Sequence, residues 1–554
     1  MSPPTVPQIP DVIAFVAHPG APIPSDLTRH TIAAETDPAP RLEVLADGAQ
    51  RVMSHRDHAG RSLYVWGRAA CDKARSDQML SEWLADATPE RLREVVGSYV
   101  LLIDDHSTRR VAMASDVLGF RPWYAGRSDG RMVAGNSVLG LARRGLAGGA
   151  VRYESIAAWL RFNFDFTPGL LIDVPRLERD AITWFDYEGN VVAIDRAPPS
   201  PTEPLLDADE IAEAMYDLVV SNFELLTDGE PSFTLPLSGG YDSRYLLGLA
   251  MQQSRKVALI HVETSPAEAT LAREVAAVAG QSIEVIPSGG HSLDAFDAPF
   301  AISPGGFPTG RNIATLAVGD RPEPVLSGFI GGWFMRDVNG RPDPADDLET
   351  IVETLVRSHA FRVNRSYLLR HDSEAAIDRR LREALRSFIT SLDPSRNPYA
   401  DFNLFGRQRH YVSSLWQQHL GTAEVLLPFV DWRLVDLRGR APLDRLTQRR
   451  YGAFMARKFP QFASIAHSKD VDSDLPEQPS RHLRRATIAL TKDLFSNGRL
   501  TDAVSRKKVA RRIPDGLRRQ LRRQDELLSL YKIKLFVEAI DNAGLKIDWR
   551  ELAR

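Results

Sequence analysis

Residues 237–243 of this chain read Leu237-Ser238-Gly239-Gly240-Tyr241-Asp242-Ser243 and stand between a short apolar run and a segment with helical spacing. The apolar run covers Phe233 to Leu237, and the helical segment covers Tyr245 to Gln252. A glycine-rich turn of this kind is typical of an anion site, because its backbone N–H groups approach phosphate oxygens at the positive end of a helix. We therefore expect the serines and glycines to bind phosphate groups, and the Asp242 carboxylate to hold a Mg²⁺ ion that accompanies them.

The spacing of this loop differs from the G-x-x-x-x-G-K-[ST] loop of other nucleotide-binding proteins, and no lysine follows the glycines. It resembles instead the S-G-G-x-D-S loop of the ATP pyrophosphatases, which split ATP between its α- and β-phosphates and leave AMP on a substrate oxygen. This resemblance implies ATP and Mg²⁺ as ligands of residues 237–243. The alternative interpretation is an ordinary Gly-Gly turn capped by Asp242 or by a serine.

Composition sets the broad class of the protein. With 554 residues and ordinary apolar (43%) and charged (25%) fractions, the chain is expected to fold as more than one domain. The net charge of −3 gives no reason to expect a nucleic-acid partner. Long apolar runs and signal-peptide features are absent from the sequence, so we expect a cytoplasmic protein without a membrane partner. The single cysteine, Cys71, excludes an internal disulfide and a cysteine-built zinc site.

The pattern of predicted strands and helices changes near residue 200. Short apolar runs around polar turns fill the first part of the chain and predict antiparallel strands, as in the hairpin from Tyr99 to Ala114. Residues 198–206 are rich in proline and predict a linker. Strands and helices then alternate as far as Ile286, which predicts a parallel sheet with its ligand site at the carboxyl ends of the strands. From about Asp346 to His419 the pattern is helical.

These patterns predict a mixed α/β and α+β protein in four segments. They are a β-rich domain over 1–197, the linker over 198–206, an α/β domain with a helical carboxyl region over 207–480, and a helical tail over 481–554. The tail is rich in arginine and lysine up to residue 523. Its simpler interpretation is a set of solvated helix faces, and the functional one is a docking patch for an acidic partner or substrate.

Several motifs outside the loop resemble one family, the asparagine synthetase-like enzymes. Ser115 to Tyr124 and Ala134 to Leu141 are similar to the D-x-x-G-x-x-P-L-Y and S-E-x-x-A-L motifs of the family's glutaminase domain. Leu326-Ser327-Gly328 is similar to a strand end that contacts the nucleotide, and Ala423 to Asp431 is similar to the L-E-x-R-x-P-F-L-D segment. The resemblance covers nearly the whole chain. It implies an Ntn-hydrolase-like αββα amino domain followed by a pyrophosphate-loop domain of the adenine nucleotide α-hydrolase type.

The same resemblance implies further site residues. Ser327, Gly328 and, at the end of the next strand, Val262 would contact the nucleotide beside residues 237–243. A lysine of the family's synthetase domain neutralises charge that develops on the adenylate and pyrophosphate. Lys469 stands at about the corresponding place, and Lys458 is the competing candidate. The alternative is that both are surface lysines.

The chain differs from the family pattern at positions that would carry catalytic residues. The glutaminase needs an amino-terminal cysteine, exposed by removal of the initiator methionine, and Ser2 stands there instead. We therefore expect no glutamine hydrolysis. In the following domain the proton-accepting Glu or Tyr of the family is replaced by Phe329, and the second magnesium-binding Asp by Gly332. Asp337 lies close by in the sequence and is a candidate replacement.

Two classes of function follow from these observations. The first is an ATP-dependent ligase that adenylates a carboxylate for attack by an amine, with Asp242 holding Mg²⁺ and Lys469 stabilising the leaving group. The β-lactam synthetases and lasso-peptide cyclases of the family close a peptide or natural product on itself, which favours a substrate of that kind over ammonia-using amidation of a glycan carboxylate. The second is a nucleotide-binding scaffold without turnover, which Phe329 and Gly332 favour. A sulfur-inserting tRNA enzyme shares the loop but needs catalytic cysteines.

Overall fold

The computed structural model describes most of the chain. The described residues are 12–17, 28–29, 41–46, 52–58, 60–71, 82–83, 86–196, 207–263, 266–287, 300–310, 321, 323–335, 346–359, 369, 374–417, 420, 423–439, 447–467, 502–505 and 524–554. The linker at 198–206 and the basic stretch of the tail around 506–523 lie outside them. Within the described residues, no helix combines the length and apolar character needed to cross a bilayer.

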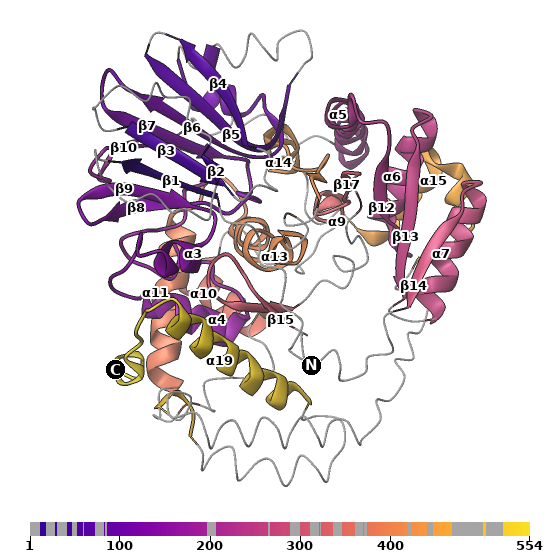
Figure 1. The fold of residues 1–554 in the computed structure, drawn as a ribbon. Helices are drawn as coiled ribbons and strands as arrows, with labels where there is room; N and C mark the ends of the chain where they lie inside the picture. Colours follow the sequence, from indigo (N-terminus) through magenta and orange to yellow (C-terminus); the bar gives the residue numbers. More distant parts are fainter. Residues whose placement is uncertain are drawn as a thin grey trace, which may run out of the picture.

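Two antiparallel sheets form the amino-terminal half of the chain (Figure 1). The first sheet has the order β2-β3-β1-β9-β8, with β1 (Val12–Ala17), β2 (Thr28–Arg29), β3 (Arg41–Ala46), β8 (Tyr124–Ser128) and β9 (Arg131–Gly135). The second has the order β11-β10-β7-β6-β5-β4, with β4 (Val52–His58), β5 (Arg61–Ala70), β6 (Val96–Asp105), β7 (Arg110–Ser115), β10 (Ala181–Asp186) and β11 (Val191–Arg196). Strands β6 and β7 pair from Val100↔Ser115 to Asp105↔Arg110, which confirms the predicted hairpin.

The two sheets pack face to face. Side chains along each strand point alternately to one face of the sheet and to the other. Tyr64 and Trp66 of β5 share one apolar cluster with Val12 and Ala14 of β1, so this cluster lies between the sheets. Ile13 of β1 faces the other way, into a cluster with helices α3 (Val138–Arg143) and α4 (Tyr153–Phe162). The opposite face of β5 packs with the short helix α2 (Pro89–Leu92). Helices therefore lie outside both sheets.

A five-stranded parallel sheet forms the second half, as the alternation of strands and helices predicts. Its order is β14-β13-β12-β17-β18, with β12 (Phe233–Pro236), β13 (Val257–Glu263), β14 (Ile283–Pro287), β17 (Val325–Leu326) and β18 (Val425–Leu426). The chain runs from β12 outward through α6 (Tyr241–Gln252) and α7 (Pro266–Val278) to β14, and then returns to the other side of β12. The order of the strands reverses at β12.

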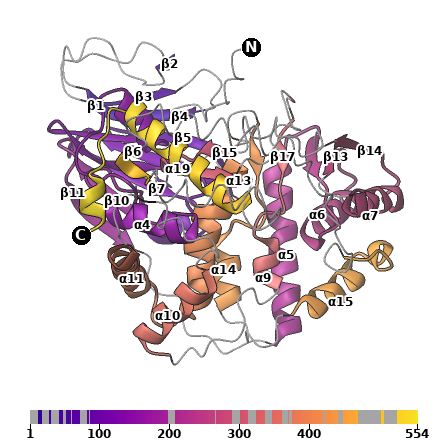
Figure 2. The same ribbon diagram turned by 90° about the horizontal axis from the view of Figure 1, so that it is seen from below.

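Helices make up most of the remaining structure. They and one small hairpin are α5 (Ala208–Thr227), β15 (Phe300–Ile302), β16 (Pro308–Gly310), α9 (Gly331–Met335), α10 (Leu348–His359), α11 (Glu374–Thr390), α12 (Pro398–Asp401), the π-helix η4 (Phe402–Val412), α13 (Ser413–Gln417), α14 (Trp432–Gly439), α15 (Gln448–Lys458), the 3-10 helix η7 (Pro460–Phe462), α19 (Gln524–Asn542) and α20 (Trp549–Leu552). Helix α19 packs beside α3 and α4, with Phe536 against Trp159 at 5.0 Å between ring centroids (Figures 1 and 2). The four predicted segment boundaries stay predictions.

The two halves share one apolar core. Phe120 of the amino-terminal half and Phe329 of the second half lie 5.5 Å apart between ring centroids, within a cluster that also contains β12 and α6. Beside them, the buried guanidinium of Arg121 forms an ion pair with Glu424. Arg121 and Glu424 belong to the two motifs that resemble the asparagine synthetase-like family, so these motifs meet across the interface.

Candidate functional site

The Ser238 loop, residues 237–240, lies at the point where the strand order reverses. It connects β12 to α6, and β12 pairs in parallel with β13 on one side and β17 on the other. The carboxyl ends of the two flanking strands carry Val262 and Ser327-Gly328. Open parallel sheets bind ligands in the crevice outside such a reversal. All the sequence-predicted nucleotide residues therefore stand at one edge of the sheet.

Hydrogen bonds between the two serines hold the loop in a closed turn. The Ser238 backbone N–H donates to Ser243 Oγ at 3.1 Å, and the two hydroxyl oxygens are 3.1 Å apart. The Gly240 N–H donates to Ser238 Oγ at 3.2 Å. Gly240 is the N-cap of α6 and supplies no side chain to it. The positive end of the helix therefore opens directly behind the loop.

Asp242 is held at the centre of the site by contacts from distant segments. Its Oδ1 accepts a hydrogen bond of 2.9 Å from the Tyr451 hydroxyl on α15. A Cβ placed on Gly328 would lie 2.9 Å from Asp242 Cβ, and one placed on Gly331 would lie 3.2 Å from Asp242 Cγ. Glycine at these two positions lets the segment after β17 touch the first turn of α6. Residues predicted from separate motifs are thus in direct contact.

A buried arginine ties the loop to the segment that follows η7. Arg244 is fully buried, and its guanidinium donates to the Gly239 carbonyl oxygen and to the Ile465 carbonyl oxygen, each at 2.9 Å, and to Ala466. Burial lowers the pKa of Arg244 below its usual value. The rings of Tyr241 and His467 are in tilted contact, with centroids 4.5 Å apart and an interplanar angle of 54°.

His261 is a second buried group that sequence reasoning missed. It precedes Val262 on β13, and its Nδ1 lies 2.8 Å from the Leu237 carbonyl oxygen. Its Nε2 is buried and has no hydrogen-bond partner within the described part of the chain. A histidine inside a strand gives no sequence signal, because its partner is set by the pairing of β12 with β13.

Two residues shortly after β17, Phe329 and Ile330, stand beside the Ser238 loop. Phe329 is buried and packs on Phe120 of the amino-terminal half, so this side chain serves the interface between the halves. Ile330 has φ of +62°. This backbone region is strained for a β-branched residue, and strain of this kind clusters at functional sites.

Of the two lysine candidates, the structure describes Lys458 alone. Lys458 forms an ion pair with Glu213, and its Nζ lies 4.1 Å from the ring centre of Tyr216. Its carbonyl oxygen accepts from Gln252 at the far end of α6, about 15 Å from Asp242 by the rise of a helix. Lys469, Ser2 and Asp337 lie outside the described residues.

Of the residues predicted to bind Mg²⁺, only the Asp242 carboxylate lies within the described segments. They contain no group of three or more His, Cys, Asp or Glu side chains arranged to hold a metal ion. Mg²⁺ in nucleotide sites is commonly bound through one or two carboxylates together with substrate phosphates and water, so Asp242 alone fits that ion and not an all-protein metal cage. Cys71 is buried on the outer face of the second sheet, among apolar residues.

Comparisons with known proteins give weak matches. No protein-family model and no curated protein matches the chain. One similar solved structure is the glutamine phosphoribosylpyrophosphate amidotransferase from B. subtilis complexed with ADP and GMP, at 11% identity and a TM-score of 0.20, covering 50% of this chain and 75% of that one. Another, the allosteric regulatory enzyme of purine biosynthesis, matches at 10% identity and a TM-score of 0.20, covering 50% and 74%. Scores this low carry no argument, so function is argued from the chain's own residues.

Proposed function

We propose that this chain is an ATP-dependent, amide-forming ligase of the asparagine synthetase-like type. In this proposal ATP adenylates a substrate carboxylate, pyrophosphate leaves, and an amine displaces AMP. The observation that carries it is the junction of the Ser238 loop with Asp242 and Gly328 at the strand-order reversal. A glycine-rich loop at the N-terminus of a helix, with one carboxylate beside it, combines what a Mg²⁺-bound triphosphate requires.

The residues around the loop support specific roles. The turn of Ser238 and Ser243 would receive the phosphates, and the Asp242 carboxylate, oriented by Tyr451, would hold Mg²⁺. Ala466 accepts from Arg244 and is three residues before Lys469 in the sequence, which supports Lys469 as the group that neutralises the leaving pyrophosphate. The contacts of Lys458 with Glu213 and Tyr216 argue against that residue.

The amine is proposed to come from the substrate itself. The one cysteine, Cys71, is buried in an apolar cluster and is not placed to hydrolyse glutamine. Phe329 cannot accept a proton from the amine. An amine on the same molecule as the activated carboxylate reacts with a high effective concentration and depends less on a base. We therefore favour a peptide or natural-product substrate that is cyclised.

The packing of Phe329 against Phe120 favours a second candidate function. A side chain committed to the interface between the halves is also what a nucleotide-binding scaffold without turnover would keep. The two candidates differ in whether an acyl adenylate forms.

Exchange of radioactive pyrophosphate into ATP tests the ligase directly. The purified chain with Mg²⁺ is assayed against a panel of peptide carboxylates, with Asp242→Asn as the inactive variant and Lys458→Met as the matched control. Substrate-dependent exchange that disappears in the first variant and persists in the second supports the ligase. Saturable ATP binding without exchange across the panel contradicts it in favour of the scaffold.

A further inference from the structure

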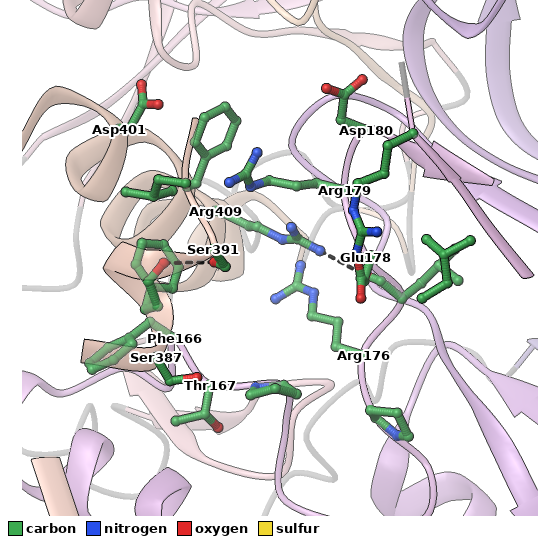
Figure 3. A pocket seen from close by; sticks show the side chains of 18 of the residues that line it. Phe166, Thr167, Arg176, Glu178, Arg179, Asp180, Ser387, Ser391, Asp401 and Arg409 are labelled. Carbon is green, nitrogen blue, oxygen red and sulfur yellow. Dashed lines mark hydrogen bonds and ion pairs between the residues drawn. The ribbon is translucent and has the colours of Figure 1, made fainter. Parts of the chain in front are cut away.

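A large cavity lies between the amino-terminal half and the helical region, separate from the Ser238 loop. Its volume is about 1010 Å³, and its walls come from the segments around Phe166 and Arg176, from α11 and from the π-helix η4. Several charged side chains line it, together with apolar and aromatic ones (Figure 3). Most of its carboxylates already have cationic partners. Asp401 pairs with Arg396 at 2.9 Å, and Asp180 pairs with Arg93 at 3.5 Å.

Among the arginines that line the cavity, Arg176, Arg179 and Arg409 have no carboxylate within ion-pair distance in the described part of the chain. Arg409 donates to the Leu177 carbonyl oxygen at 2.8 Å. Arg176 donates to the Gly119 carbonyl oxygen at 2.7 Å and contacts His410 Nδ1 at 2.9 Å. Arg179 lies over the Phe405 ring, 3.9 Å from its centroid. Figure 3 shows these three guanidinium groups directed into the middle of the cavity, with Asp180 and Asp401 at its margin.

Their hydrogen-bonding capacity is only partly used. Arg409 is 7% exposed, and the buried Nε atoms of Arg176 and Arg409 have no partner within the described residues. A guanidinium carries five N–H donors in a planar fork that matches carboxylate and phosphate oxygens. Each arginine therefore has donors left for a ligand.

Nearby carboxylates offset only part of this positive charge. Burial and the adjacent positive charges of Arg176 and Arg179 hold the pKa of Arg409 well below its usual value. The buried carboxyls Asp116 and Asp165 act on Arg176 in the opposite sense, and Asp116 does so on Arg409. Both carboxyls accept hydrogen bonds from their own turns, and burial raises the pKa of each to about 6. A buried cluster of like charges is costly unless a counter-charge is present.

The wall that supplies Arg409 and His410 is itself unusual. Residues 402–412 form a π-helix, a conformation that occurs mostly as short turns and often at functional sites. Because a π-helix of this length is rare, its presence in the cavity wall supports a ligand-binding role for the cavity.

We propose that this cavity binds a small phosphate-bearing anion with two or more negative charges, held by Arg176, Arg179 and Arg409. Phosphate is favoured over a single carboxylate because three converging forks can surround several oxygens of one tetrahedral group. Phe166 and Phe405 also line the cavity and would contact an apolar or planar part of the ligand. The inference does not depend on the ligase activity.

The test uses the full-length chain and measures thermal unfolding and calorimetric binding with inorganic phosphate and pyrophosphate. Sodium chloride at equal ionic strength is the reference. Citrate tests whether the cavity prefers a polycarboxylate to phosphate. The wild type is expected to gain thermal stability with phosphate or pyrophosphate beyond the chloride reference. Arg179→Gln and Arg409→Gln are each expected to weaken this binding by about tenfold or more, a loss of about 1.4 kcal/mol.

Two controls separate the cavity from other anion sites. Asp242→Asn, in the first turn of α6 beside the Ser238 loop, should keep the phosphate response, and so should Arg196→Gln, because Arg196 is already paired with Glu178. If Arg409→Gln fails to fold, Arg179→Gln decides, since Arg179 packs on the Phe405 ring and donates no hydrogen bond within the described residues. Phosphate protection no greater than that of chloride, equal protection in the cavity variants, or stronger protection by citrate than by phosphate would each overturn the proposal.

Discussion

Gly328 is the position where the candidate nucleotide site tolerates least change. An added Cβ would lie 2.9 Å from Asp242 Cβ, 3.0 Å from its carbonyl carbon and 3.1 Å from its carbonyl oxygen. Two of these are backbone atoms at the start of α6, so no side-chain rotation relieves the overlap. The segment after β17 and the loop must separate by several tenths of an ångström. Overpacking of this kind costs about 1–3 kcal/mol of folding free energy.

Gly328→Ala should therefore lower stability and weaken nucleotide binding together. Urea unfolding gives the first quantity and calorimetric titration with Mg-ATP gives the second, where we expect a loss of about tenfold or more, equivalent to about 1.4 kcal/mol. The matched control is Gly148→Ala, because no atom lies within 4 Å of an added Cβ there. A Gly328→Ala protein as stable as the control, and with wild-type Mg-ATP affinity, would refute the contact between Gly328 and Asp242 as the basis of the site.

Further predictions concern the interface and the pH dependence of stability. Glu424→Ala leaves the buried Arg121 charge without its partner and should destabilise the chain by about 2–3 kcal/mol, whereas Glu424→Ala combined with Arg121→Met should recover most of the loss. Additive losses in urea unfolding would contradict this coupling. Burial beside Phe162 and Phe402 lowers the pKa of His359 to about 4, so the unfolded chain takes up this proton near its ordinary value of 6.5 before the folded chain does. The free energy of unfolding of the wild type should thus fall by up to about 3 kcal/mol as the pH drops from 6.5 toward 4. The His359→Phe variant lacks this titration, so its stability relative to wild type should rise over the same pH range. An unchanged difference between the two proteins from pH 7 to pH 4.5 would disprove the assignment.

The strand–loop–helix around Ser238 was predictable because its signals are local. An apolar run, two glycines and a helical repeat occupy twenty consecutive residues, and each acts on its immediate neighbours. The reversal of strand order follows from where the chain returns to the sheet at β17, which no local pattern encodes. The sequence therefore predicts the loop and the parallel sheet, whereas the position of the loop at the reversal requires the structure.

Contacts between distant segments were beyond sequence reasoning. Tyr451 reaches Asp242 across 209 residues, and Arg409 reaches Leu177 across 232. Arginines in a helical stretch resemble solvated positions until the fold places them against one another. Likewise, the identity of Phe329 excludes proton transfer, but only its contact with Phe120 shows what the side chain does instead.

Equilibrium binding of Mg-ATP to the wild type and to Asp242→Asn is the most direct test of the central claim that the Ser238 loop is an ATP site. Saturable binding to the wild type that weakens by about tenfold or more in Asp242→Asn, and is unchanged in Lys458→Met, is the predicted result. Absence of binding to the wild type, or equal affinity in Asp242→Asn, would contradict it.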